Sequence, residues 1–362
     1  MKAIVWTAYG GPEVLQLREV EKPVPADNEV LIKIHATTVT AGDWETRRLA
    51  LPFWIRLPMR FYVGFTKPKR MTILGQELAG EIEAVGKDVT RFKPGDQVFA
   101  ATGFGLGGYA EYICLPEVAE DGVVATKPAN MSFEEAAAVP FGALEALYFL
   151  KKANIRAGER ILINGAGGTI GTYAVQLAKH YGANVTAVDS PGKFDMLRAI
   201  GADQVIDYTR EDFAKDGQTY DVIMDVIGKS SFSASMRSLT PTGRYLLVNP
   251  RVSHMFRGLW SSMTSSKRVI AGAASRTTED LHFVKGLIEA RKLRAVIDRC
   301  YPLERAVEAH RYAESGQKKG NLVITVAGSA GTPNGRRPDQ SPAGRGGDRQ
   351  SSRQVSDHGP RR

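Results

Sequence analysis

The chain has 362 residues, of which 43% are hydrophobic and 24% are charged, and its formal net charge is +9. This length allows two domains with hydrophobic cores, and the composition excludes a collagen-like or wholly disordered chain. Seven arginines and three aspartates give residues 329–362 a net charge of +4, which leaves only +5 on the rest. The body is therefore only mildly basic, and no specific nucleic-acid partner is expected.

The cysteine content and the apolar runs indicate the cellular compartment of the protein and whether it enters a membrane. Two cysteines, Cys114 and Cys300, cannot form a disulfide framework and favour a reducing, cytoplasmic setting. The opening MKAIVWTAYG lacks the apolar core of a signal peptide. No apolar run reaches the ~18 residues that a membrane span needs, so stable membrane insertion is not expected.

Residues 1–130 alternate short strand patterns with glycine and proline turns such as Lys93-Pro94-Gly95-Asp96. This alternation predicts an all-β, barrel-like domain. The expected strands are Ala3–Trp6, Leu15–Val20, Glu29–Thr38, Glu81–Val85, Gln97–Ala100 and Ala110–Leu115.

A helix is expected after this domain. Ser132 suits an N-cap, and Glu134 and Glu135 suit a first turn. Because Ala136–Leu150 is apolar at helical spacing, we expect one helix here that leads into a second domain.

Residues 158–193 have the pattern of strand, glycine turn, helix and strand. Ile161–Ile163 is a short apolar run of the kind buried in a parallel sheet. Apolar residues then recur at helical spacing over Ala174–Ala178, before a second buried strand at Val185–Val188 ends in Asp189. The pattern predicts a βαβ unit.

The turn of this unit has the spacing G-x-x-G-x-x-G, at Gly165, Gly168 and Gly171, and Ile170 stands where the strict G-x-G-x-x-G needs glycine. Such glycines allow a tight turn and close approach of a pyrophosphate, which the N–H groups from Thr169 onward would bind. Asp189 would accept hydrogen bonds from an adenosine ribose. We therefore expect a dinucleotide site, with a plain glycine-rich turn as the alternative.

Strands and helices continue to alternate beyond this unit, which predicts a doubly wound parallel sheet. The expected strands are Gln204–Ile206, Asp221–Val226 and Arg244–Val248, and the helices Phe194–Ile200, Ser231–Leu239 and Glu279–Arg291.

The last ordered elements are expected to return to the first domain: strand Val296–Tyr301, helix Leu303–Glu314 and strand Asn321–Val326. We thus expect a β-rich domain of residues 1–130 plus 295–327 and a dinucleotide-binding domain of residues 131–294. Residues 328–362 are rich in Gly, Pro, Ser and Arg and predict a disordered tail.

Several motifs occur together in one order: Met1-Lys2-Ala3, GQELAGEIEAVG at 75–86, FKPGDQV at 92–98 and the glycine turn. With these motifs, residues 1–327 resemble the medium-chain dehydrogenase/reductase superfamily, and most closely its zinc-free quinone oxidoreductase-like branch. The resemblance implies an α/β protein with an N-terminal GroES-like barrel and a Rossmann domain. It also implies a homodimer that uses NAD(P)H to reduce small apolar quinones or α,β-unsaturated carbonyls by hydride transfer.

The resemblance implies no zinc. Zinc-dependent relatives carry metal ligands where this chain has Thr40, Gln76 and Pro140–Gly142. Without a Lewis acid, simple alcohol oxidation loses its usual electrophile. Reduction of a conjugated carbonyl needs less help, because charge delocalises onto a remote oxygen.

The same resemblance gives Thr40, as a hydrogen-bond donor, and Asp43 as candidate catalytic residues, and Tyr62 is a further candidate donor. Asp43 is equally a helix N-terminal or turn carboxylate. Trp44 stands where relatives have tyrosine and cannot exchange a proton, and Glu77 is expected to be a buried structural acid.

Two sets of residues bear on the choice of cofactor. Asp189 should repel a 2′-phosphate and favour NAD(H), whereas Lys193 and Tyr208 fall where NADP-using relatives contact that phosphate. The balance favours NAD(H). The resemblance also assigns the ribose and nicotinamide surroundings to Ile227, Val248, Asn249 and Asn321.

The stretch Arg47–Arg70 combines seven basic residues with aromatic and aliphatic ones and contains no acid. It predicts a substrate lid that includes Trp54 and Phe61, with a packed insertion or an anionic-surface site as alternatives. Two other functions also stay open: a zinc-free alcohol dehydrogenase-like enzyme, and a dinucleotide-binding protein that mainly binds RNA, a membrane or a partner.

Overall fold

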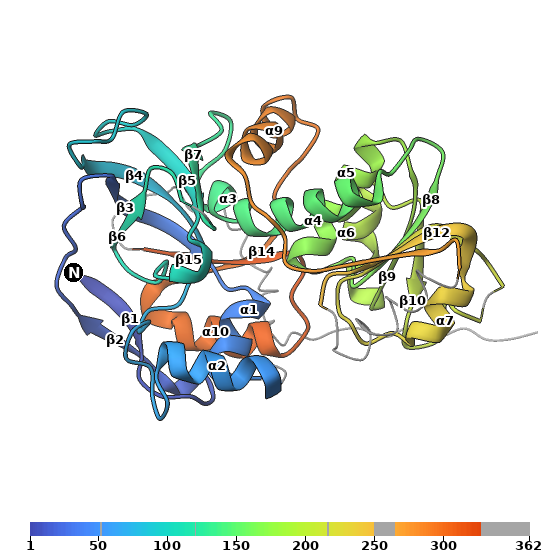
Figure 1. Ribbon diagram of the computed structural model, residues 1–362, viewed down its shortest axis with the longest axis horizontal. Coiled ribbons are helices and arrows are strands. Elements are labelled where there is room, and N and C mark those ends of the chain that lie inside the picture. The colour runs from blue at the N-terminus through green and yellow to red at the C-terminus, as the bar shows by residue number, and fades with distance from the viewer. Residues whose placement is uncertain (51–52, 120, 216, 250–264, 327–362) are drawn as a thin grey trace, which may run out of the picture. The chain divides into compact units, whose positions relative to one another are not determined.

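Two large β-sheets organise the chain, one of seven strands and one of six (Figure 1). The computed structural model describes residues 1–50, 53–119, 121–215, 217–249 and 265–326, with only the backbone of residues 53–55. A separate antiparallel pair is formed by β1 (Lys2–Trp6) and β2 (Leu15–Glu19).

The seven-stranded sheet confirms the predicted β-rich N-terminal region. Its strand order is β14-β15-β3-β4-β5-β7, and β6 pairs with β3. All pairs are antiparallel except β14 with β15. The strands are β3 (Glu29–Thr38), β4 (Glu77–Val85), β5 (Gln97–Ala101), β6 (Tyr112–Pro116), β7 (Val123–Thr126), β14 (Ile297–Pro302) and β15 (Asn321–Thr325).

The expectation that residues 1–130 contain only strands is wrong, because two helices lie between β3 and β4. Helix α1 (Ala41–Arg48) begins with a capping box in which Thr40 and Asp43 bond each other's backbone N–H groups. Helix α2 (Phe53–Val63) continues despite Pro58. Strand β7 was also not predicted.

The single helix expected over Ala136–Leu150 is two helices, α3 (Phe133–Ala137) and α4 (Pro140–Ala153). Pro140 is the cause, since it has no N–H to donate to the carbonyl of Ala136 and its ring crowds that carbonyl. The predicted N-cap Ser132 is confirmed, and it forms a capping box with Glu135.

The six-stranded sheet is parallel throughout, in the order β10-β9-β8-β11-β12-β13, which confirms the doubly wound prediction. Its strands are β8 (Arg160–Asn164), β9 (Asn184–Asp189), β10 (Gln204–Asp207), β11 (Tyr220–Asp225), β12 (Leu239–Leu247) and the unpredicted β13 (Arg268–Ala271). Its helices include α5 (Thr169–His180), α6 (Phe194–Ala199), α7 (Phe232–Arg237) and α9 (Thr278–Glu289).

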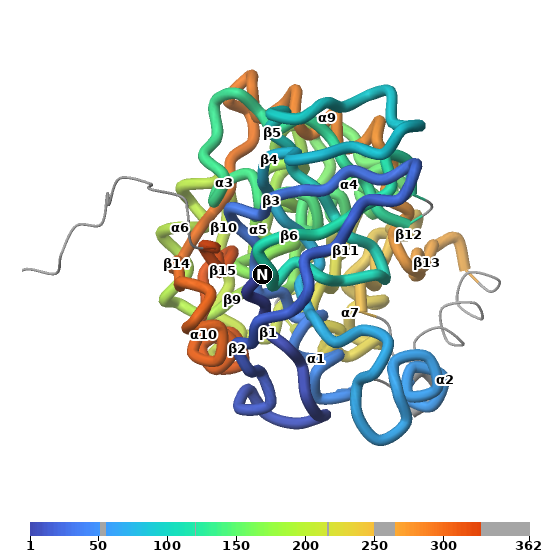
Figure 2. The backbone as a smooth tube through the Cα atoms, turned by 90° about the vertical axis from the view of Figure 1, so that its left-hand side faces the viewer, coloured from blue at the N-terminus to red at the C-terminus, as the bar shows by residue number. Residues whose placement is uncertain are grey.

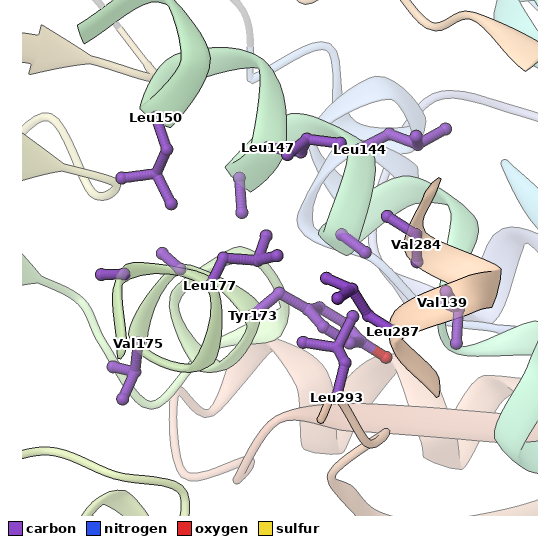
Figure 3. Close-up of a cluster of buried hydrophobic side chains, with 14 of the residues drawn as sticks. Val139, Leu144, Leu147, Leu150, Tyr173, Val175, Leu177, Val284, Leu287 and Leu293 are labelled. Atoms are coloured by element: carbon purple, nitrogen blue, oxygen red, sulfur yellow. The ribbon is translucent and has the colours of Figure 1, made fainter. Parts of the chain in front are cut away.

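Both faces of this sheet are buried, as the apolar run in β8 predicts. Ile161 and Ile163 join a core with α4 and α5, whereas Leu162 points to the other face and joins a cluster with Phe232 and Met236 of α7. Figure 3 shows the first core, where side chains of α4 and α5 meet Val284 and Leu287 of α9.

The C-terminal elements return to the first sheet, as expected. Strand β15 lies between β14 and β3 and pairs with β3 in antiparallel register, Ile324 opposite Thr37. Figure 2 shows the orange-red trace of β14 and β15 coming back beside the blue trace of β3. Between them, α10 spans Ala306–Glu314, so the helix expected from Leu303 begins one 3-10 turn later.

The expected domain boundaries, the disordered tail and the lack of membrane insertion remain predictions. The domain boundaries at residues 130 and 295 stay a prediction. The tail 328–362 lies outside the described residues, and within the described part no helix is long and apolar enough to cross a membrane.

Candidate functional site

The glycine turn after β8 is built as the sequence predicts. Gly165 has a left-handed φ of 86°, and a Cβ there would lie 2.5 Å from Cγ1 of Ile227. A Cβ on Gly171 would lie 2.3 Å from the carbonyl oxygen of Gly165. Gly165 is therefore needed for the turn and Gly171 for the packing of helix on strand.

The N-terminus of α5 is free to receive an anion. Its N-cap is Gly168, and no side chain among the described residues caps it. The N–H groups of the first turn, from Thr169 to Gly171, point toward the turn and combine with the helix dipole. A Cβ at Gly168 would lie 3.7 Å from its nearest neighbour, the carbonyl oxygen of Gly165, so the backbone is open here, and a pyrophosphate is an anion of the kind that such helix N-termini bind.

A lysine that the sequence analysis did not single out reaches the same helix end. Lys318 Nζ donates to Thr169 Oγ1 over 2.7 Å and to the carbonyl of Gly320 over 3.1 Å. Gly320 in turn donates from its N–H to the carbonyl of Gly167 over 2.8 Å. The loop before β15 therefore brings a cation to the glycine turn.

Asp189 and Lys193 form an ion pair beside this turn, with Nζ 2.9 Å from Oδ1. Asp189 also accepts from the backbone N–H of Gly167 over 2.7 Å and of Ser190 over 2.8 Å. Both side chains are buried, whereas Tyr208 at the end of β10 is 59% exposed. The structure thus brings Asp189 and Lys193 together and leaves Tyr208 exposed just after β10, the strand that pairs with β9.

The predicted residues after β11 and β12 also come together. Ile227 lies over Gly165, and Asn249 donates from its side-chain amide to the carbonyl of Val226 over 2.8 Å. Val248 donates from its N–H to the carbonyl of Asp225 over 3.1 Å. These residues lie at the carboxyl ends of adjacent parallel strands, where doubly wound sheets bind ligands.

Asn321 begins β15 and is buried. Its side-chain amide donates to the carbonyl of Val296 over 3.1 Å, while its Oδ1 has no partner among the described residues. A buried unpartnered oxygen is costly, so it is available to a donor from a bound molecule.

Thr40 and Asp43 form one buried unit at the start of α1. Asp43 Oδ2 accepts from the N–H of Thr40 over 2.8 Å and lies 2.7 Å from its hydroxyl, and Oδ1 accepts from the N–H of Gly75 over 3.0 Å. The capping box shows that Asp43 is a helix N-terminal carboxylate, one of the two roles expected for it. Burial raises its pKa, and the hydrogen bonds from Thr40 and Gly75 oppose that rise.

Asp43 is also connected to a buried tyrosine and histidine. The Tyr109 hydroxyl is hydrogen-bonded to Asp43 and lies 3.2 Å from Nε2 of His310. Tyr109 and His310 are fully buried, and burial lowers the pKa of His310 to about 3. The neutral imidazole of His310 is therefore hydrogen-bonded to Tyr109, which is hydrogen-bonded to Asp43.

On the other side, Gln76 connects Thr40 to a pocket. Its Oε1 lies 3.1 Å from Thr40 Oγ1. The pocket has a volume of about 460 Å³, and its lining is mostly apolar: Thr46, Pro58, Met59, Tyr62, Met71, Gln76, Gly103, Phe104 and Leu106. Tyr62 is thus brought to the same pocket by α2, and the volume is within the range of small-molecule sites.

Glu77 is fully buried next to this cleft. It accepts from the Thr38 hydroxyl and from the N–H of Phe141, the latter over 2.7 Å. Burial raises the pKa of Glu77 to about 7, and burial lowers the pKa of Lys318 to about 8, with the charge of Glu77 opposing the second shift. This pair was not predicted to interact, since the two residues are far apart in sequence.

Within the described residues, no group of three or more His, Cys, Asp or Glu side chains could hold a metal ion. Thr40, Gln76 and Gly142 offer no thiolate or imidazole at the positions where the resemblance puts zinc ligands. Zinc independence stays a prediction about the protein in solution.

Two family models match the chain. One is described as the alcohol dehydrogenase GroES-like domain and matches residues 26–127; the other is described as zinc-binding dehydrogenase and matches residues 200–324. The first match covers β3 to β7, and the second runs from β10 to β15.

Proteins of known name resemble the chain over nearly its whole described length. A chloroplastic quinone-oxidoreductase homolog from Spinacia oleracea is 33% identical over 338 residues, which cover 90% of this chain and 98% of that protein. A quinone oxidoreductase from Pseudomonas aeruginosa is 34% identical over 342 residues, covering 89% of this chain and 99% of that one. The solved quinone oxidoreductase from Coxiella burnetii has a TM-score of 0.80 and 31% identity, covering 90% of this chain and 99% of that chain.

Proposed function

The chain belongs to the medium-chain dehydrogenase/reductase superfamily, in its quinone oxidoreductase-like branch, and we propose that it reduces quinones or α,β-unsaturated carbonyls with NADH and without zinc. Membership makes it an oxidoreductase that uses a nicotinamide cofactor. The substrate class, the choice of NADH and the site residues are the proposal.

The observation that supports this function best is the pairing of an anion cradle with an apolar pocket. The cradle consists of the uncapped N-terminus of α5 and Lys318, and suits the diphosphate of a dinucleotide. The pocket of about 460 Å³ suits a small apolar molecule.

NADH is favoured by the way Lys193 is held. Its ammonium is bound to Asp189, and its side chain is only 10% exposed. To contact a 2′-phosphate, Lys193 would have to leave this ion pair, and the phosphate would approach the carboxylate of Asp189. A ribose with two free hydroxyls meets no such cost.

The cofactor, when bound, supplies hydride to the substrate carbon. This chain's residues would orient the substrate oxygen and stabilise its negative charge. Gln76 and Tyr62 line the pocket and carry N–H and O–H donors, and Thr40 holds the Gln76 amide from behind. An ionised Asp43 can only accept hydrogen bonds. The single proton of the Thr40 hydroxyl is therefore shared between two acceptors, Asp43 Oδ2 and Gln76 Oε1.

The test is turnover of NADH and NADPH with a panel of quinones and enones. We expect oxidation of NADH well above background, and a preference for NADH over NADPH of at least about tenfold, which corresponds to about 1.4 kcal/mol. Clear NADH binding without turnover of any member would overturn the proposal and favour a binding protein.

The Asp189→Ser variant tests the cofactor preference separately. Loss of the carboxylate frees Lys193, so NADPH use should rise while NADH use falls. A wild-type enzyme that already prefers NADPH would show that the ion pair does not select the cofactor. The family resemblance also suggests a homodimer, which sedimentation would test. The cysteine content favours a cytoplasmic setting, which cell fractionation would test.

A further inference from the structure

We propose that α2 and the loop after it dock on an anionic lipid bilayer, so that an apolar substrate passes from the lipid into the pocket behind α2. The proposal rests on the proposed function for its substrate, but the surface itself is argued from exposure and charge. The docking surface consists of Arg56, Leu57, Phe61, Phe65, Lys67, Lys69 and Arg70.

The apolar part of this surface has no cover within the described residues. Leu57 is 54% exposed, Phe61 70% and Phe65 55%. Leu57 and Phe61 are four residues apart on α2 and so lie on one side of the helix, and the rings of Phe61 and Phe65 are 5.8 Å apart. Large exposed apolar side chains that gather in one place mark an interaction site.

The opposite side of α2 packs against the rest of the protein. Val63 is fully buried and Met59 packs against the core of the first sheet. Pro58 and Tyr62 line the pocket. Leu57 and Phe61 are therefore left for solvent or a partner, and both views show α2 at the periphery of the folded unit (Figures 1 and 2).

The charge around these side chains selects an anionic partner. Arg56, Lys67, Lys69 and Arg70 are all exposed. No aspartate or glutamate occurs between Glu45 and Glu77. Aromatic residues combined with a basic rim are typical of helices that lie in the headgroup region of anionic membranes.

The pocket opens beside the docking surface. Tyr62 and Phe104, which line the pocket, are themselves 52% and 69% exposed. Of the eleven large hydrophobic side chains exposed in the described part of the chain, five belong to the docking surface or to this mouth. An apolar quinone dissolved in a bilayer would thus reach the pocket without crossing water.

The experiment is cosedimentation of the full-length protein with vesicles of phosphatidylglycerol or of phosphatidylcholine. We expect at least about tenfold tighter binding to phosphatidylglycerol, weakened when salt rises from ~0.05 M to ~0.5 M. Two variants should each weaken it at least about tenfold: Leu57→Ser/Phe61→Ser/Phe65→Ser and Arg56→Gln/Lys69→Gln/Arg70→Gln. Equal binding to both lipids, or no binding, would overturn the proposal.

A matched control is Lys87→Gln/Lys93→Gln/Lys215→Gln, which removes three lysines whose side chains are 71%, 81% and 83% exposed elsewhere. It should bind vesicles like the wild type; weakening equal to that of the basic variant would mean net charge alone acts and would refute the docking surface. If the wild type does not bind vesicles and the apolar substitutions dissociate a dimer in solution, the surface is instead a contact between copies of the chain.

Kinetics separates this inference from the proposed function. Turnover of a water-soluble short quinone should be unchanged in the basic variant, because Arg56, Lys69 and Arg70 do not line the pocket. Turnover of a long-chain quinone in vesicles should fall together with binding. If no quinone is turned over but vesicle binding behaves as described, the proposed function fails and the docking surface stands.

Discussion

At the residue scale, buried polar groups near the cleft depend on one another more than their sequence positions suggest. Asp43 accepts from Thr40 and Gly75 and is backed by Tyr109. The motif resemblance identified Thr40 and Asp43, and the T-x-x-D spacing could have identified the capping box. Nothing local in the sequence marks Tyr109 as their partner, because the contact joins the first turn of α1 to a loop residue 66 positions beyond Asp43.

Replacing Thr40 tests the hydroxyl that lies between Asp43 and Gln76. Thr40→Val keeps the shape but removes the hydroxyl, so Gln76 loses its support and Asp43 loses a donor. We expect kcat/KM for a quinone to fall about tenfold or more, with little change in the Kd for NADH. Thr40→Ser is the control and should stay within about threefold of wild type. A wild-type rate in Thr40→Val would show that the Thr40 hydroxyl does not contribute to catalysis.

Glu77 should make stability depend on pH in a definite direction. Its pKa is about 7 in the folded protein, against an ordinary 4.5. Between these values the folded state holds a proton that the unfolded state has released, so this group's contribution to stability is lost as pH rises from about 4.5 to about 7.

The measurement is the free energy of unfolding of wild type minus that of Glu77→Gln, at about pH 5 and about pH 8. We expect this difference to drop by roughly 1 to 3 kcal/mol at the higher pH, since one pKa unit corresponds to about 1.4 kcal/mol. Glu304→Gln, at an exposed side chain, should give a difference that does not change. A flat difference for Glu77→Gln would show that the carboxyl ionises normally.

At the element scale, periodicity found most strands and helices, and it failed where one residue interrupts a pattern. The apolar run over 136–150 has helical period throughout, yet Pro140 divides it into α3 and α4. At this division the Tyr173 hydroxyl donates to the carbonyl of Ala138 over 2.8 Å. Short strands such as β13, with only four residues, carry too weak a pattern to be found alone.

Helix α4 should be among the most sensitive elements, because it packs between α5 and α9 (Figure 3). Leu147 is fully buried there, so Leu147→Ala removes apolar contacts and leaves a cavity. We expect a loss of about 2–5 kcal/mol in urea unfolding. Leu57→Ala, at a side chain 54% exposed, should change stability by no more than about 0.5 kcal/mol. Equal losses would mean that α4 is not part of the stable core.

At the scale of the whole molecule, the glycine turn and the order of motifs were enough to predict both sheets and the family. They also predicted that β14 and β15 return to the first sheet. What they did not give is the cluster of Lys318, Thr169 and Glu77, because it forms only when the loop before β15 lies against α5. Local patterns specify elements, whereas such clusters depend on how the elements are assembled.

The metal content of the whole protein tests the zinc prediction. Thr40 and Gln76 stand where the resemblance puts thiolate and imidazole ligands, so tight zinc binding is not expected there. We expect protein purified with zinc present to contain well below one zinc per chain by mass spectrometry of the metal. Activity should survive a chelator. Stoichiometric zinc, or activity lost to the chelator and restored by zinc, would contradict the prediction.

The position of β15 between β14 and β3 has a consequence for synthesis on the ribosome. About 280 residues separate the end of β3 from the start of β15, and at ~5–20 residues per second they take roughly 15–60 s to translate. Throughout that time the end of β3, Ala36–Thr38, has no native partner on the edge that β15 will occupy, because β6 pairs only with Glu29–Lys33, and such edges pair readily with other chains. Ribosome-bound chains that stop before β14 should therefore be cut by protease near β3, whereas chains with β15 fully emerged should resist. We therefore expect the nascent chain to depend on shielding by chaperones until β15 has been made.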